Sequence, residues 1–353
     1  MFNELPFISV IIPFRNEEIY LRGCLDSILD NNYPHNKMEI ILVDGMSTDN
    51  SPEIIREYKL KFKNIFLYMN PGKTFPIAVN IGIVNSTGEF IFIMGSHAVY
   101  HRNYFTLCIE TSLKYNADNS GGILNTIGLN KNFIGKAINN VLTSRFGVGN
   151  SLFRTGVKEV GEVDTVFGGC YKKSVFDKIG LFNENLTSSS DMDFNTRLRK
   201  AGGKILLNPA VVATYYTRND FRKFLKNNFR NGYWAIIPLK YIDYIPVEFR
   251  HLVPLLFVLG IIGLIAASFF SIYFLWVILL GAFIYLCAAY YFSSHFLKDG
   301  FKYTLILPFF YFSLHVSYGL GSLFALFGVL FSKNFYRLRF NKKIKQHKFE
   351  PKK

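Results

Sequence analysis

The sequence contains no lysine, arginine, aspartate or glutamate in the 47 residues from His251 to Leu297. Because one membrane span needs about 20 apolar residues, this stretch is long enough for two spans joined by a tight turn. A buried helix of a soluble core is the alternative, but such helices seldom have continuous apolar runs of this length. We predict spans near 252–270 and 273–293, and a third span near 305–331, where a second uncharged run contains "SYGLGS" as a candidate break.

Cysteine is also scarce, and the cysteines form no CxxC pair and no dense framework, which argues against a disulfide scaffold and a zinc ribbon. Reduced thiols in a cytosol-facing protein are the simplest interpretation. The N-terminus lacks a basic segment followed by an apolar one, as in a secretory signal, so we expect residues 1–217 to stay in the cytoplasm. The four cysteines are Cys24, Cys108, Cys170 and Cys287.

The excess of basic residues is unevenly distributed along the chain. The net charge is +15, yet residues 1–217 are nearly balanced, with 22 basic and 20 acidic residues. Residues 218–250 have seven basic and three acidic residues, and residues 332–353 have nine basic and one acidic. A basic excess on both sides of an apolar block favours anionic membrane lipids over nucleic acid as the partner.

These patterns predict four parts. Residues 1–217 form a cytoplasmic domain, 218–250 a basic amphipathic segment at the membrane interface, 251–331 a transmembrane region, and 332–353 a basic tail. Three spans that start from a cytoplasmic domain would place the basic tail outside, against the positive-inside tendency. Either the third segment is interfacial or re-entrant, or the tendency fails here, and both interpretations stay open.

The first part alternates strand and helix signals. Apolar runs predict strands over 7–14, 38–45, 64–70 and 90–95, and helical spacing follows each of the first three. We expect Ser51 to cap the second helix before Pro52, and Gly88 to end the third. Such alternation predicts an α/β fold with a doubly wound, nucleotide-binding sheet.

In sheets of this kind the ligand lies at the carboxyl ends of the strands. All four predicted ends have polar or ligand-binding residues, but no GxGxxG and no GxxxxGK[ST] motif occurs, so dinucleotide and P-loop sites are disfavoured. The four ends are Pro13 to Glu17, Asp44 to Asp49, Asn70 to Lys73, and Gly95 to His97.

Several of these residues have two interpretations. Asp44 and Asp49 either accept hydrogen bonds from a base or ribose, or serve a turn and a helix cap. Lys73 follows a Pro-Gly turn, where its ammonium either meets a diphosphate or is a solvated loop charge. Further along, Gly168 and Gly169 would let a substrate approach the backbone closely.

A second acidic pair lies at the start of a predicted helix that ends at "AGG" (201–203). From chemistry alone Asp191 and Asp193 are equally helix caps and candidates for a general base.

Six blocks, taken in order, resemble family 2 glycosyltransferases, especially membrane-anchored members that build bacterial polysaccharides. The resemblance covers roughly 7–331 and implies a GT-A fold with a mixed, mostly parallel sheet, helices on both faces and C-terminal membrane helices. The blocks are "SVIIPFRNEE", "IILVDGMSTDNS", "NIGIVNSTGEFIFIMGSHAVYH", "FGGCYKKSVFDKIGLFNENL", "SDMDFNTRLRKAGGKILLNP" and "FRNGYW".

The resemblance implies roles for individual positions on the donor side. Asp44 matches the nucleotide-binding Asp of the family. Pro13, Asn16 and Glu17 match the first-strand loop beside the base, and Lys73 matches a position near the sugar nucleotide.

On the acceptor side, Asp191 matches the Asp of the "ED" motif, the general base that deprotonates the acceptor hydroxyl, and Asp193 lies beside it. Gly168 and Gly169 fall in the block expected near the acceptor. "FRNGYW" resembles a segment that closes over the acceptor, so Arg230 would meet phosphate and Trp234 would stack on a sugar.

Two positions depart from the family pattern. Members have Asp-X-Asp or Asp-Ala-His after the fourth strand to hold Mg²⁺ or Mn²⁺, whereas this chain has Gly95, Ser96 and His97. Ser190 occupies the Glu position of the "ED" motif. Hard cations prefer oxygen ligands, so His97 with diphosphate oxygens would hold Mg²⁺ weakly and Mn²⁺ better. Metal binding through His97 and the donor, little metal dependence, and lost activity all stay open.

The resemblance therefore predicts an inverting glycosyltransferase that uses a UDP- or GDP-linked donor and a lipid-linked or growing glycan acceptor in polysaccharide biosynthesis. Gly95 and Ser96 would lie beside the donor. A processive polymer synthase is a rival, and the lack of a full Gln-x-x-Arg-Trp motif counts against it. The alternative of another class is a catalytically silent, sugar-nucleotide-binding subunit that assembles with other polysaccharide-assembly proteins.

Overall fold

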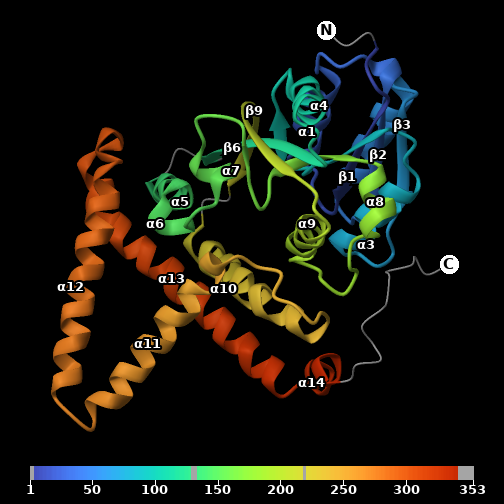
Figure 1. Ribbon diagram of the computed structural model, residues 1–353. Coiled ribbons are helices and arrows are strands. Elements are labelled where there is room, and N and C mark those ends of the chain that lie inside the picture. Colours follow the sequence, from blue (N-terminus) through green and yellow to red (C-terminus); the bar gives the residue numbers. More distant parts are fainter. Residues whose placement is uncertain (1–3, 129–132, 218–219, 341–353) are drawn as a thin grey trace. The chain divides into compact units, whose positions relative to one another are not determined.

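The chain folds into two compact units, each drawn from more than one stretch of sequence. A computed structural model describes residues 4–128, 133–217 and 220–340. Within these ranges, the first unit comprises residues 4–125 and 152–216, and the second comprises 126–151 and 217–340. Figure 1 shows the first unit as a twisted sheet with helices and the second as mainly helices.

The first half of the sheet is parallel. β1 (Ile8–Phe14) pairs with β2 (Met38–Asp44) and with β4 (Phe90–Ile93), and β3 (Ile65–Met69) pairs with β2. All seven residues of β2 are buried, which is why its sequence is nearly continuously apolar rather than alternating. The strand order reverses between β1 and β4, because β2 lies on one side of β1 and β4 on the other. Sheets of this kind bind ligands at the carboxyl ends of the strands beside such a reversal.

The second half of the sheet is antiparallel, so the sheet is mixed, as predicted. β8 pairs with β4, and the full order is β3-β2-β1-β4-β8-β6-β9-β5, with β7 paired to β9. These later strands are β5 (Ala98–Tyr100), β6 (Asn119–Gly128), β7 (Gly161–Glu162), β8 (Phe167–Lys172) and β9 (Ile205–Thr217).

Helices cover both faces of the sheet, also as predicted. Ile8, Val10 and Ile12 of β1 pack in one apolar cluster with residues of α1, α2 and α4. Ile11 points the other way, into a second cluster with residues of α3, α8 and α9. The helices of this unit are α1 (Leu21–Leu29), η1 (His35–Lys37), α2 (Ser51–Lys61), α3 (Phe75–Val84), α4 (Tyr104–Tyr115), α7 (Leu152–Thr155), α8 (Ser174–Ile179) and α9 (Ser190–Lys200).

Two predicted helix boundaries are wrong. Ser51 is the first residue of α2 rather than its cap, because its hydroxyl accepts a hydrogen bond from the backbone N–H of Glu17. Helix α3 ends at Val84 rather than at Gly88. Gly88 has a different task, since a Cβ there would lie 2.5 Å from the backbone nitrogen of Ser9.

The second unit contains three helices that are long and apolar enough to cross a membrane. They are Phe249–Ser268, Tyr273–Ser294 and Phe301–Leu330, and they overlap the three spans predicted from sequence. The elements of this unit are α5 (Phe133–Thr143), α6 (Arg145–Val148), α10 (Phe221–Ile236), η2 (Ile237–Lys240), η3 (Phe249–His251), α11 (Val253–Ser268), α12 (Tyr273–Ser294), η4 (Leu297–Asp299), α13 (Phe301–Leu330) and α14 (Lys333–Phe340).

Glycines set the packing of α10 against α13, which lie side by side (Figure 1). A Cβ on Gly232 would lie 1.9 Å from the carbonyl oxygen of Tyr318, and one on Gly321 would lie 2.0 Å from that of Phe229. The Ser322 hydroxyl donates to the Gly232 carbonyl at 3.0 Å. The "SYGLGS" segment is therefore continuous helix, and its glycines permit close backbone contact rather than a break.

Candidate active site

Asp44 is a buried carboxylate at the end of β2, with 2 % of its surface exposed. Its Oδ1 accepts hydrogen bonds from the backbone N–H of Ser47 at 2.8 Å and from the Ser47 hydroxyl at 2.7 Å. Among the described residues no hydrogen bond reaches Oδ2. One oxygen thus fixes the carboxylate, and the other is left for a ligand that donates hydrogen bonds.

The loop after β1 is hydrogen-bonded to the loop after β2. Asn16 Oδ1 accepts from the backbone N–H of Thr48 at 2.8 Å, and the backbone N–H of Asn16 donates to the Ser47 hydroxyl at 3.0 Å. Pro13 precedes this loop in β1, in register with Val43. The two loops are therefore joined at the carboxyl ends of β1 and β2, with Pro13, Asn16 and Asp44 close together.

Asp49 serves the turn, which was one of its two interpretations. Its carboxylate accepts from the backbone N–H groups of Glu18 and Ser51, both at 3.0 Å. Desolvation opposes the charged form of Asp49, but these hydrogen bonds outweigh it and lower its pKa.

Three strand-end loops each contain a residue other than glycine in the left-handed region. Asn16, Met46 and Lys73 have φ values of 56°, 62° and 59°. Such conformations cost free energy and cluster where a loop is shaped for a ligand. The Lys73 side chain is exposed on the turn after β3, and the backbone N–H of Lys73 donates to the Asn70 carbonyl.

Gly95 follows β4, and Tyr100 occupies its backbone groups. The Gly95 N–H donates to the Tyr100 hydroxyl at 2.7 Å, and that hydroxyl donates to the Gly95 carbonyl at 3.0 Å. A Cβ built on Gly95 would meet no atom closer than Phe167 Cζ at 3.5 Å, so the backbone has room for a side chain. The next residue, Ser96, is buried.

His97 pairs with Glu17 from the neighbouring loop. Its Nδ1 lies 3.3 Å from Glu17 Oε1, and its ring meets the Tyr215 ring edge-on, with centroids 5.1 Å apart. The sequence marked both partners but could not pair them, and it gave no signal for Tyr215. That tyrosine reaches the site because β9 pairs with β5 in the register that joins Tyr215 to Ala98.

The side chains around His97 do not form a metal site by themselves. Among the described residues, no three His, Cys, Asp or Glu side chains come close enough together to hold an ion. One imidazole and one carboxylate that bind each other are fewer ligands than Mg²⁺ or Mn²⁺ takes, and position 95 adds none.

Asp191 is exposed in the first turn of α9. Desolvation by the surrounding protein raises its pKa, while the backbone N–H groups of Asp191 and Met192 partly oppose that shift. A carboxylate with a raised pKa is a better proton acceptor than an ordinary one, provided that it remains ionised at the working pH.

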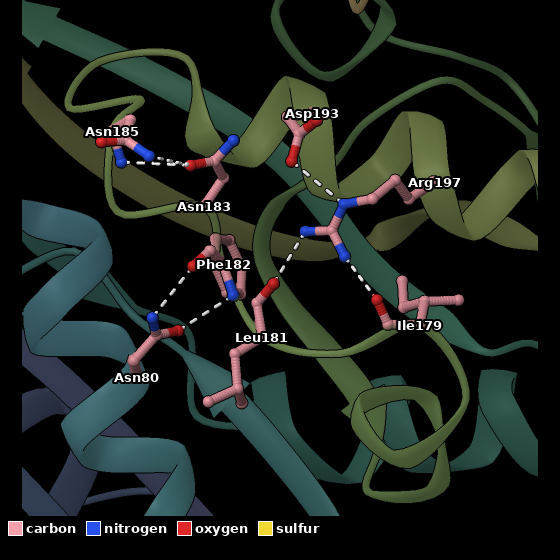
Figure 2. Close-up of polar contacts among 8 residues, drawn as sticks. All are labelled: Asn80, Ile179, Leu181, Phe182, Asn183, Asn185, Asp193 and Arg197. Carbon is pink, nitrogen blue, oxygen red and sulfur yellow. Dashed lines mark hydrogen bonds and ion pairs between the residues drawn. The ribbon is translucent and has the colours of Figure 1, made fainter. Parts of the chain in front are cut away.

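Asp193, two residues later, has a different environment. Its carboxylate is buried and accepts from Arg197 Nε at 3.0 Å, one helical turn along α9. The same guanidinium donates to the carbonyls of Ile179 and Leu181, as Figure 2 shows. Asp193 therefore orients an arginine that holds the chain between α8 and α9.

Figure 2 also shows a second set of hydrogen bonds to the segment between α8 and α9. Asn80 of α3 donates to the carbonyl of Phe182 and accepts from its N–H, both at 2.9 Å. Residues 179–183 are thus fixed from α9 on one side and from α3 on the other.

Gly168 and Gly169 are both buried in β8, where other residues of the protein, rather than a substrate, lie close to their backbone. Gly168 has φ +59°, and a Cβ there would lie 2.3 Å from the Tyr104 hydroxyl; at Gly169 it would lie 2.7 Å from Asn119 Oδ1. Internal packing by itself accounts for the two glycines.

Arg230 and Trp234 lie on α10, in the second unit. Arg230 is exposed and donates to Asn227 Oδ1 at 3.0 Å. Trp234 is half-buried against an apolar cluster that includes Ile236 and Leu255.

Comparisons with known proteins give the family. The profile of Glycosyl transferase family 2 matches residues 9–180. A dolichyl N-acetyl-alpha-D-glucosaminyl phosphate 3-beta-D-2,3-diacetamido-2,3-dideoxy-beta-D-glucuronosyltransferase from Methanococcus voltae is 34 % identical over 233 residues, 64 % of this chain and 72 % of the relative. The succinoglycan biosynthesis protein ExoA from Rhizobium meliloti is 24 % identical over 59 % of this chain and 63 % of its own length.

Among solved structures, the mannosyltransferase PcManGT from Pyrobaculum calidifontis, in complex with GDP-Man and Mn²⁺, superimposes with a TM-score of 0.60 at 17 % identity. The match covers 91 % of this chain and 88 % of the mannosyltransferase. This likeness identifies the fold as GT-A. With the strand-end site, the profile match and the relative at 34 % identity, the chain belongs to glycosyltransferase family 2 and is an enzyme of that class.

Proposed function

We propose that this glycosyltransferase inverts the transferred sugar, with Asp191 as the general base. The observation that carries the proposal is the contrast between the two acids of α9. Asp191 is open to solvent in the first turn of α9, whereas Asp193 is buried in an ion pair with Arg197. Only the first is free to exchange a proton with a substrate.

In the proposed reaction the acceptor hydroxyl gives its proton to Asp191 as its oxygen attacks the anomeric carbon. The bond from that carbon to the donor phosphate breaks on the opposite face, and the nucleoside diphosphate leaves with the electron pair. One carboxylate is enough for such a single displacement.

The donor is a sugar linked to UDP or GDP in this proposal. Asp44 Oδ2 accepts from the base or ribose, and Pro13, Asn16 and Glu17 form the neighbouring wall. Lys73, Gly95, Ser96 and His97 lie toward the diphosphate. A GDP-sugar in the solved mannosyltransferase of the same fold supports a nucleotide-sugar donor in general.

We propose that the acceptor is a lipid-linked or growing glycan at the cytoplasmic face of the membrane. The name of the Methanococcus relative specifies a dolichyl-phosphate-linked substrate, and three helices here are long enough to cross a membrane. The succinoglycan relative supports a role in extracellular or capsular polysaccharide biosynthesis. Arg230 and Trp234 are the acceptor-binding candidates of the second unit.

We assign no step to a divalent cation. The Pyrobaculum mannosyltransferase was solved with Mn²⁺, but the residues around His97 do not supply a set of metal ligands here. Protein side chains must then offset more of the charge on the leaving diphosphate.

A donor screen on membranes that contain the protein tests the proposal, with mass spectrometry of lipid-linked products as the readout. We expect one UDP- or GDP-sugar to add one sugar mass to a lipid-linked glycan. Asp191→Asn should abolish that product and keep donor binding, and Asp177→Asn, an exposed acid in the first turn of α8, should leave the product unchanged. Turnover by Asp191→Asn would remove Asp191 from the role of base.

A further inference from the structure

Arg154, in the short helix α7, has a buried guanidinium nitrogen without a partner. Its Nη1 makes no hydrogen bond to any residue in the described part of the chain. An arginine stays charged in proteins, and a buried charge without a partner is costly. Burial lowers the pKa of Arg154. No motif in the sequence analysis pointed to this residue.

The surroundings of Arg154 are aromatic rather than acidic. The guanidinium carbon lies 5.2 Å from the centre of the Phe153 ring, and the Tyr215 phenol partly opposes the lowering of the Arg154 pKa by burial. A phenol and a ring face attract a cation weakly compared with a carboxylate or a phosphate. Among the described residues, the buried Nη1 nitrogen of Arg154 therefore has no anion as a partner.

Tyr215 and Phe167 lie beside the predicted diphosphate site. The Tyr215 ring lies edge-on to His97 at 5.1 Å and to Phe167 at 6.5 Å. Phe167 is in turn the nearest side chain to a Cβ at Gly95, at 3.5 Å. Phe153, whose ring faces the Arg154 guanidinium, packs with Phe167 and Tyr215 against one apolar cluster, and that cluster includes Met94 and Ala98, the residues on either side of Gly95 to His97.

We propose that Arg154 binds the diphosphate of the donor and supplies positive charge where other family members use a carboxylate-held metal. Without the carboxylate at position 95 the site has fewer ligands for a metal ion, so the charge of the diphosphate is left for a cationic side chain to offset. Arginine suits the task because its planar fork donates two parallel hydrogen bonds to phosphate oxygens. The assignment rests on the proposed use of a nucleotide-sugar donor.

Calorimetric titration of the detergent-solubilised full chain with UDP, UMP, GDP and GMP, in EDTA, tests this assignment. We expect Arg154→Met to weaken binding of the preferred nucleoside diphosphate by about 10- to 100-fold, the range for hydrogen bonds to a charged group. Binding of the monophosphate should weaken by less than about threefold, because we expect Arg154 to contact the second phosphate. The diphosphate affinity of Arg154→Lys should lie between those of the wild type and Arg154→Met, since lysine keeps the charge but loses the paired N–H donors.

Thermal unfolding without ligand separates binding from folding. A ligand-binding role predicts that Arg154→Met unfolds at the same temperature as the wild type or higher, because an unpaired buried charge is removed. Arg102→Met, at an exposed arginine of the same unit, should change neither measurement.

The outcomes are distinct. Equal diphosphate binding by Arg154→Met and the wild type would overturn the assignment and leave the proposed function intact. Equal losses for mono- and diphosphate with a lowered unfolding temperature would assign Arg154 to packing instead. If the wild type bound neither UDP nor GDP, the proposed donor would itself be wrong, and the assignment with it.

Discussion

Ser47 holds Asp44 through a single oxygen, since Oδ1 accepts from both the N–H and the hydroxyl of Ser47. The same hydroxyl accepts from the backbone N–H of Asn16 at 3.0 Å. One serine therefore orients the predicted nucleotide-binding carboxylate and joins the β1 loop to the β2 loop.

Ser47→Ala should weaken binding of the preferred UDP or GDP by about 10- to 100-fold, the cost of losing one hydrogen bond to a charged acceptor. Calorimetric titration measures the loss. Ser86→Ala is the matched control, because its hydroxyl is also buried in a turn but donates to the Ile83 carbonyl after α3. Equal losses in both variants would mean that the change is a general loosening of the unit.

The pH dependence of transfer should report Asp191. The general base acts only when ionised, and desolvation raises its pKa, so the rate should fall as the pH falls through that raised value. The fall should therefore begin above the ordinary range of an aspartate, about 3.9. A profile of kcat/KM against pH measures it, and a rate that stays constant down to about pH 4 would contradict the prediction.

Asp193→Ala should destabilise the protein, because it leaves the mostly buried Arg197 guanidinium without its carboxylate. Breaking a buried pair from one side costs about 3–5 kcal/mol, or roughly 10 °C of unfolding temperature in a unit of this size. Differential scanning fluorimetry measures the change. Asp193→Ala combined with Arg197→Met should recover part of it, and no recovery would show that the two residues are not coupled.

Gly95→Asp should introduce metal dependence. The backbone has room for a side chain at this position, and an Asp there would add an oxygen ligand near His97. We expect Mn²⁺ to strengthen nucleoside diphosphate binding by more than about tenfold in the variant and by much less in the wild type. If Mn²⁺ acts equally on both, His97 has a role other than metal binding.

Gly321→Ala should separate α13 from α10, because its Cβ would lie 2.0 Å from the Phe229 carbonyl oxygen. Overpacking of this kind costs about 1–3 kcal/mol, which thermal unfolding in detergent detects. Gly260→Ala, on α11, is the matched control, since no atom outside its own helix lies within 4 Å of a Cβ there. A similar drop in unfolding temperature in both variants would argue against close packing of α10 on α13.

The parallel half of the sheet could be predicted from sequence because its signals are local. Each strand from β1 to β4 is a short apolar run, mostly buried in β1, β2 and β4 and partly exposed in β3, and the strand-end residues follow directly in the chain. The antiparallel strands could not, because β8 and β9 acquire their partners from residues many positions away. Tyr215 reaches His97 only through such a pairing, so its place in the site was not predictable.

Helix boundaries failed where side chains bind other segments. Helical spacing begins at Asn16, yet α1 starts at Leu21, because residues 16–18 bind the loop after β2 instead. The resemblance to the family suggested both Asp191 and Asp193 for the site. Only tertiary contacts distinguish the two acids. Asp193 accepts from Arg197 on the same helix, and Arg197 in turn donates to the carbonyl of Ile179 in another segment.

The order of the two units along the chain affects how the enzyme can be dissected. The helical unit takes one piece from residues 126–151 and another that starts at 217, and the two pieces share an apolar cluster that includes Ile138 and Tyr311. A single stop codon or protease cut after 217 would leave the first piece attached to the sheet with its apolar surface uncovered. A soluble catalytic fragment would therefore need a short polar linker in place of 126–151 as well as the truncation.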